Sequence, residues 1–143
     1  MERREFLKLL GSVPILPLAV GAELYAEPAH ALFLGDFTVA GFQYHQGMLP
    51  QVSRHLAAGT SLLVERDGGN PYDAYEVRIL TPQAVLLGYL PRNQNRAVAT
   101  MADQGVSLTA RITAYQQDAA PWERLAISLW AVVPPAACHR GLA

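Results

Sequence analysis

Cysteine and charge are both scarce in this sequence of 143 residues. The single cysteine, Cys138, excludes an intramolecular disulfide and leaves oxidising and reducing compartments equally open. Charged residues make up 16% of the chain, and the formal net charge is −1. This balance excludes a protein that binds nucleic acid mainly by neutralising phosphates over a broad basic surface. Any affinity for nucleic acid must therefore come from a local site.

The motifs of common enzymes are also missing. There is no Gly-x-Ser-x-Gly motif and no glycine-rich phosphate loop before a helix. His45 and His55 lack the i, i+4 spacing of a helical metal pair, and Cys138 beside the tail prolines is a poor nucleophile candidate. Asp73 with His45 could form an acid/base pair, but nothing supplies a nucleophile or oxyanion hole. We predict no catalytic residue, metal ligand or cofactor, and a hydrolase or other enzyme acting on nucleic acid is the weakest alternative.

No apolar run is long enough to cross a bilayer as a helix, which needs about 20 apolar residues. The run from Leu9 to Ala22 is interrupted by glycine and proline. It follows a charged start, and Ala29-His30-Ala31 offers a small-x-small cleavage site, so we predict a signal peptide over 1–31. The start, Arg-Arg-Glu-Phe-Leu-Lys, resembles the twin-arginine (Tat) export signal. We expect a periplasmic or secreted mature chain without a membrane span, or a cytoplasmic chain if the signal is not used.

Residues 32–135 carry the pattern of one small domain, and the tail 136–143 is predicted to be unstructured. Alternation and turn residues predict strands near 37–45, 61–66, 75–80, 84–90, 106–115 and 124–133. Helical patterns are predicted for 49–58 and 93–104. Many short strands with few helices predict a mainly β (α+β) fold, a small OB-like or SH3-like barrel of about six strands with one or two short helices.

The alternation also predicts which side chains form the core. The inward residues of two strands should be Val77, Ile79, Leu108, Ala110 and Ile112. An apolar helical stripe that includes Val98 and Met101 should close one end of the barrel.

Two short runs stand out as one candidate site, Asn70-Pro71-Tyr72-Asp73 and Gly88-Tyr89-Leu90-Pro91-Arg92. Pro71 has a fixed φ, and the residue before a proline is pushed out of the α region. The first run therefore predicts a rigid turn with Tyr72 and Asp73 at its exit. A third run, Val39 to Gly47, contains Gln43-Tyr44-His45 and completes the site. Tyrosines, a carboxylate and a guanidinium on stiff turns are typical of a small-ligand or chain-end site.

In their order, these runs resemble the HIRAN domain, a small β-barrel module. It is fused to helicase-like proteins in eukaryotes and often stands alone in bacteria. The resemblance covers about half of the chain. It is carried by V-A-G-F-Q-Y-H-x-G, L-x-x-G-x-x-L-x-V-x-R-D-x-x-N-P-Y-D, L-G-Y-L-P-R-x-x-N and G-V-x-L-x-A-R-I. Two positions depart from the pattern. His45 stands where a second aromatic is expected, and Tyr75-Glu76-Val77 stands where a small apolar residue usually precedes the valine.

The resemblance implies a non-catalytic module that holds the 3′ end of single-stranded DNA. Tyr44 would be one stacking platform and His45 a poorer one, and Tyr72 would form a second aromatic wall. Asp73 would accept a hydrogen bond from the 3′-hydroxyl, and Arg92 would contact a phosphate. The predicted cleft is bordered by Gln43, Tyr44, His45, Tyr72, Asp73, Tyr89 and Arg92.

Each of these residues also has a purely structural interpretation. Tyr44 and Tyr72 would then be half-buried barrel residues, Asp73 would cap its own turn, and Arg92 would be solvated or paired with Asp73. The corresponding functional alternative is an exported β-barrel that binds a periplasmic protein or another small ligand and has no role with nucleic acid.

Overall fold

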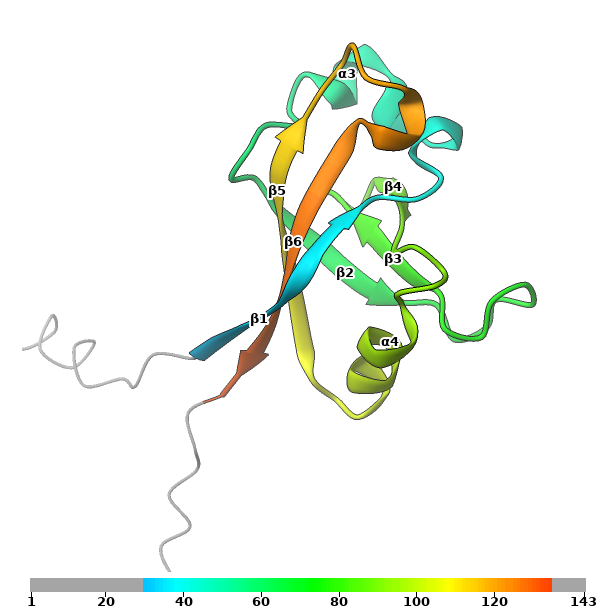
Figure 1. Cartoon of the computed structure of the whole chain (residues 1–143), viewed down its shortest axis with the longest axis vertical. Helices are drawn as coiled ribbons and strands as arrows, with labels where there is room; N and C mark the ends of the chain where they lie inside the picture. The colour runs from blue at the N-terminus through cyan, green and yellow to red at the C-terminus, as the bar shows by residue number, and fades with distance from the viewer. Residues whose placement is uncertain (1–29, 135–143) are drawn as a thin grey trace, which may run out of the picture. The chain divides into compact units, whose positions relative to one another are not determined.

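The computed structural model describes residues 30–134 (Figure 1). The predicted signal peptide, apart from its last two residues, and the predicted tail with Cys138 lie outside this range. The first strand begins at His30 and so includes the last two residues of the predicted signal peptide. In the described part, no helix is long and apolar enough to cross a membrane.

Six strands and a few short helical segments make up the described chain. The strands are β1 His30–Thr38, β2 Ser61–Arg66, β3 Val77–Leu80, β4 Leu86–Tyr89, β5 Ser107–Tyr115 and β6 Leu125–Val133. The α-helices are α3 Pro50–Ser53 and α4 Arg96–Asp103, and the 3₁₀ turns are η1 Phe42–Tyr44, η2 Gln46–Met48 and η3 Pro121–Glu123. The prediction of a mainly β fold with about six strands is confirmed.

The strands form one antiparallel sheet in the order β1-β6-β5-β2-β3-β4. Figure 1 shows β1 running along β6 and the sheet curling so that the chain after β1 approaches β4. There, Ala40 and Tyr89 exchange two backbone hydrogen bonds of 2.8 and 2.9 Å. The ladder is not continuous around the barrel, but this bridge brings the two ends of the sheet together.

The core lies inside this curled sheet. Its buried side chains include Val39, Phe42, Leu62, Leu87, Leu125, Ile127 and Leu129. The predicted inward faces of β3 and β5 are confirmed, because Val77, Ile79, Ala110 and Ile112 are all buried. Leu108 is only half-buried against the core.

Two segments differ from the sequence prediction near the candidate site. The predicted first strand over 37–45 is correct only at its first two residues: β1 runs from His30 to Thr38, and Gln43 to His45 lie in and after a 3₁₀ turn. Gly41 has φ of 71°, a left-handed conformation that interrupts an extended strand. The predicted helix over 49–58 is reduced to the four residues of α3.

Helix α4 starts three residues later than predicted. The segment from Pro91 to Gln94 instead forms a turn, in which Gln94 N–H donates to the carbonyl of Pro91 at 2.9 Å. Asn95 occupies the cap position, but its side chain caps no backbone group of the helix. The predicted apolar stripe is partly confirmed, since Val98 is buried and Met101 is half-buried.

Candidate functional site

The turn at Asn70 is stiff and displays Tyr72. The Asn70 Oδ1 atom accepts hydrogen bonds from the backbone N–H groups of Tyr72 at 2.8 Å and Asp73 at 3.3 Å. This is an Asx turn, in which a side chain replaces a backbone acceptor. Tyr72 is 85% exposed at its apex, so the alternative of a half-buried barrel tyrosine does not apply to it.

Asp73 is buried directly behind this turn. Its Oδ1 accepts the backbone N–H of Tyr75 at 2.9 Å, and its Oδ2 accepts the side-chain amide of Asn95 at 2.7 Å. The Tyr75 N–H hydrogen bond, with Asn95 and the charge of Arg92 adding to it, outweighs burial and lowers the pKa of Asp73. Asp73 is therefore an ionised acceptor that anchors its own turn. Each carboxylate oxygen has two lone pairs, so acceptor capacity remains for a ligand hydroxyl.

A second carboxyl group lies beside Asp73. Burial, together with the neighbouring Asp73 charge, raises the pKa of Glu76. The pKa values of the two carboxyl groups are thus shifted in opposite directions. Asp73 therefore ionises more readily than Glu76.

His45 and Tyr89 pack together at the centre of the site, between the turns that carry Tyr44 and Tyr72. Their ring centroids are 5.3 Å apart in an edge-to-face arrangement. Burial lowers the pKa of His45, so this imidazole is neutral at pH 7. Gly88 permits the close approach of β4 to the preceding run, because a Cβ there would overlap the backbone oxygen of Ala40. The motif glycine is therefore required by the Ala40–Tyr89 bridge.

Tyr44 projects from η1 and is 82% exposed. The turn is anchored by its neighbour Phe42, which is fully buried and meets the ring of Tyr115 edge-on with centroids 6.1 Å apart. A surface pocket of about 590 Å³ lies beside it, lined by Tyr44, His45, Gln46, Leu49, Ala84, Val85 and Leu86.

The segment from Tyr89 to Arg92 joins the two ends of the site. Tyr89 is bonded to Ala40, and Leu90 N–H donates to the carbonyl of Val77 at 3.0 Å. Arg92 is exposed and close enough to Asp73 to lower the pKa of that carboxyl. All three sequence runs therefore meet through this segment. Gln43 differs from the other predicted site residues. Its amide oxygen is buried without a hydrogen-bond partner in the described chain.

Sequence reasoning missed Trp122, which is 60% exposed on η3. η3 packs against η1, the turn that carries Tyr44, and the two lie side by side in Figure 1. The available signal was a tryptophan, the only aromatic residue in the connection 116–124. Asn95 belongs to the L-G-Y-L-P-R-x-x-N motif, but its bond to Asp73 spans 22 positions of sequence, and no local pattern predicts it.

The side chains of the site are suited to binding a ligand. Within residues 30–134, no group of three or more His, Cys, Asp or Glu side chains is arranged to hold a metal ion. The exposed groups are aromatic rings and a guanidinium, and the buried group is an ionised acceptor. Such an arrangement fits a ligand that offers flat rings, a hydroxyl donor and a phosphate.

The fold and the site define a small β-barrel binding module. The family model of the HIRAN domain matches residues 32–134, and the chain belongs to the HIRAN domain family.

The solved structures that are similar to this chain include two crystal structures. A protein from Lactobacillus plantarum has 31% sequence identity, with a TM-score of 0.66, and the match covers 74% of this chain and 99% of that one. The crystal structure of the HIRAN domain of human HLTF has 16% identity and a TM-score of 0.56, with 73% and 80% covered. The HLTF likeness shows the fold alone. A comparison with curated proteins gave no match.

Proposed function

We propose that this HIRAN domain binds single-stranded DNA at a free 3′ end. The observation that carries the proposal is the turn at Asn70, which exposes Tyr72 and places ionised Asp73 behind it. An exposed tyrosine gains by stacking on a base, and each stacked base contributes about 1–3 kcal/mol. An ionised carboxylate accepts from a hydroxyl but repels a phosphate.

Each residue of the site has a role in this proposal. Tyr44 and Tyr72 stack on bases, Asp73 accepts from the 3′-hydroxyl, and Arg92 contacts a phosphate. Trp122 extends the aromatic surface beyond Tyr44. His45 and Tyr89 pack against each other at the centre, and Gln43 borders the site on η1. We place no catalytic step at this site.

Fluorescence anisotropy with a short labelled single strand tests the proposal. The single strand should bind more tightly than the same sequence in a blunt duplex, because duplex bases are not free to stack on the tyrosines. The slope of log K against log salt should be shallow, since few cations contact phosphates. Equal binding of single strand and duplex, or no binding at low salt, would instead favour a module for a protein or another small ligand.

We also propose that the chain is exported through the Tat pathway and cleaved after Ala31. The proposal is supported by the paired Arg3 and Arg4 and the small residues at 29–31. Cleavage there would remove the first two residues of β1, which pair with Val133 and Val132. N-terminal sequencing of the periplasmic protein should begin at Leu32. An Arg3→Lys, Arg4→Lys variant that is exported as before would rule out the route.

A further inference from the structure

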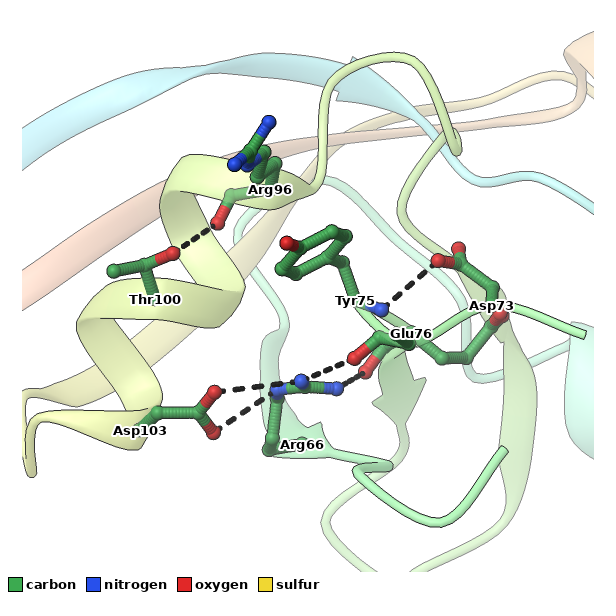
Figure 2. A network of polar contacts seen from close by, with 8 residues as sticks. Arg66, Asp73, Tyr75, Glu76, Arg96, Thr100 and Asp103 are labelled. Atoms are coloured by element: carbon green, nitrogen blue, oxygen red, sulfur yellow. Dashed lines mark hydrogen bonds and ion pairs between the residues drawn. The ribbon is translucent and has the colours of Figure 1, made fainter. Parts of the chain in front are cut away.

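The loop that carries Tyr72 and Asp73 is tied to helix α4 at three places. Figure 2 shows the two that involve Arg96 and Asp103. At the start of the helix, Asn95 donates to Asp73. In the first turn, the guanidinium of Arg96 lies over the ring of Tyr75, 5.2 Å from its centroid. At the end of the helix, Asp103 pairs with Arg66 of β2 at 3.1 Å.

Arg66 is the centre of the third connection. Besides Asp103, its guanidinium donates to two loop carbonyls, that of Glu76 at 3.0 Å and that of Ala74. The guanidinium offers five N–H donors in a rigid fork, so one side chain can hold two carbonyls and a carboxylate together. Arg66 is mostly buried, with its side chain 17% exposed.

We propose that Arg66 and Asp103 are positioning residues for DNA binding, and this inference rests on the proposed function. They fix the backbone at Ala74 and Glu76, directly after the two residues that meet the ligand. The carboxylate of Asp103 holds the Arg66 guanidinium in one orientation. The guanidinium in turn holds the loop through its hydrogen bonds to the two carbonyls. Without that carboxylate, the guanidinium is held only by the two loop carbonyls, and the placement of Tyr72 and Asp73 relative to Arg92 is less firmly fixed.

The chain contains a matched control for this ion pair. Glu65, which neighbours Arg66 on β2, pairs with Arg78 of β3 at 2.8 Å. Within the described residues, neither side chain of this pair bonds to a loop carbonyl. The side chains of Asp103 and Glu65 are 54% and 55% exposed. Asp103→Asn and Glu65→Gln therefore remove the same charge from equally exposed positions. Any general gain in DNA affinity from the lost negative charge should be equal in the two variants.

Anisotropy titrations with a 3′-hydroxyl oligonucleotide should separate the two variants. Asp103→Asn should bind about two- to fivefold more weakly than Glu65→Gln, the scale of one exposed ion pair. The salt slope should be the same in both, because neither residue contacts phosphate. Asp103→Glu should restore binding. Equal affinities would overturn the inference, as would tighter binding with a steeper salt slope in Asp103→Asn, which would mean that a released Arg66 contacts phosphate.

Hydrogen exchange provides a readout that does not need DNA. The Tyr75 amide is bonded to Asp73, and the Asp67 amide is bonded to the Glu76 carbonyl. Both amides should exchange faster in Asp103→Asn than in Glu65→Gln, with equal urea midpoints of unfolding. Equal exchange would refute the positioning role. If the wild-type chain binds no DNA, the proposed function fails, and exchange still decides whether Arg66 and Asp103 fix the loop.

Discussion

Tyr44 and Tyr72 are almost equally exposed, but they are held in different ways. Tyr44 sits on a 3₁₀ turn whose neighbour, Phe42, is sunk into the barrel core. Tyr72 sits on a loop fixed by Asn70, Asp73 and Arg66 through hydrogen bonds. Apolar packing depends on volume and is insensitive to pH and salt, whereas a polar framework depends on charge and direction. Tyr44 and Tyr72 are therefore exposed to almost the same extent, but their positions are sensitive to different perturbations.

The largest effect is expected at the apolar end. Phe42→Ala removes a fully buried ring and should cost about 3–5 kcal/mol of unfolding free energy. The urea midpoint should fall accordingly. A loss below about 1 kcal/mol would show that η1 is not anchored by this side chain.

Truncation of the displayed tyrosines should change binding rather than stability. Tyr44→Ala and Tyr72→Ala should each weaken single-stranded DNA by about 1–3 kcal/mol, the contribution of one stacked base. The urea midpoints should remain nearly unchanged, since both rings are exposed. Phe33→Ala is the control, because this exposed ring on β1 packs on Trp130 and lies outside the site. Equal losses in all three variants would mean that the aromatic contribution is not local.

A smaller effect should follow from breaking the polar end. Asn70→Ala removes the acceptor of two backbone N–H groups and should cost about 0.5–2 kcal/mol of stability, as for a lost helix cap. Affinity for DNA should fall with it, because Tyr72 loses its fixed direction. Asn70→Asp should retain most of both, since a carboxylate accepts the same hydrogen bonds. An unchanged affinity in Asn70→Ala would show that the turn does not position the tyrosine.

The smallest effect concerns pH at the centre of the site. Burial lowers the pKa of His45 below its reference of about 6.5, so protonation and any added phosphate contact should develop only below that pH. DNA affinity should rise below that pH, and the slope of log K against log salt should become steeper by about 0.7, the value for one added phosphate contact. Stability should fall over the same range, because the unfolded chain binds that proton more readily. His45→Gln should remove the rise in affinity, and a rise already complete at pH 7 would contradict the assignment.

Local patterns were sufficient to predict much of the barrel. The bounds of β2 were predicted at both ends, and the buried faces of β3 and β5 followed from strict alternation. Alternation failed from Gly41 onward, because a left-handed residue and the burial of Phe42 convert an apparent strand into 3₁₀ turns. The turn at Asn70 was predictable from the Asn-Pro pair, because proline fixes φ and the asparagine before it is pushed out of the α region.

The supports of the site could not be predicted in the same way. Asn95 reaches Asp73, and Arg66 reaches Asp103, across 22 and 37 positions of sequence. Such pairs depend on where the barrel places helix α4, which no local pattern specifies. The surface residues of the site were visible in the sequence because they are part of motifs, whereas the contacts behind them are tertiary.

The most direct test compares two oligonucleotides that differ only at their end, one with a 3′-hydroxyl and one with a 3′-phosphate. A terminal phosphate would bring negative charge to the ionised Asp73, so the hydroxyl strand should bind more tightly. Asp73→Asn should lose that preference, because the asparagine carries no charge and its side-chain oxygen still accepts a hydrogen bond. Equal anisotropy titrations of the two oligonucleotides by the wild-type chain would contradict recognition of the 3′ end.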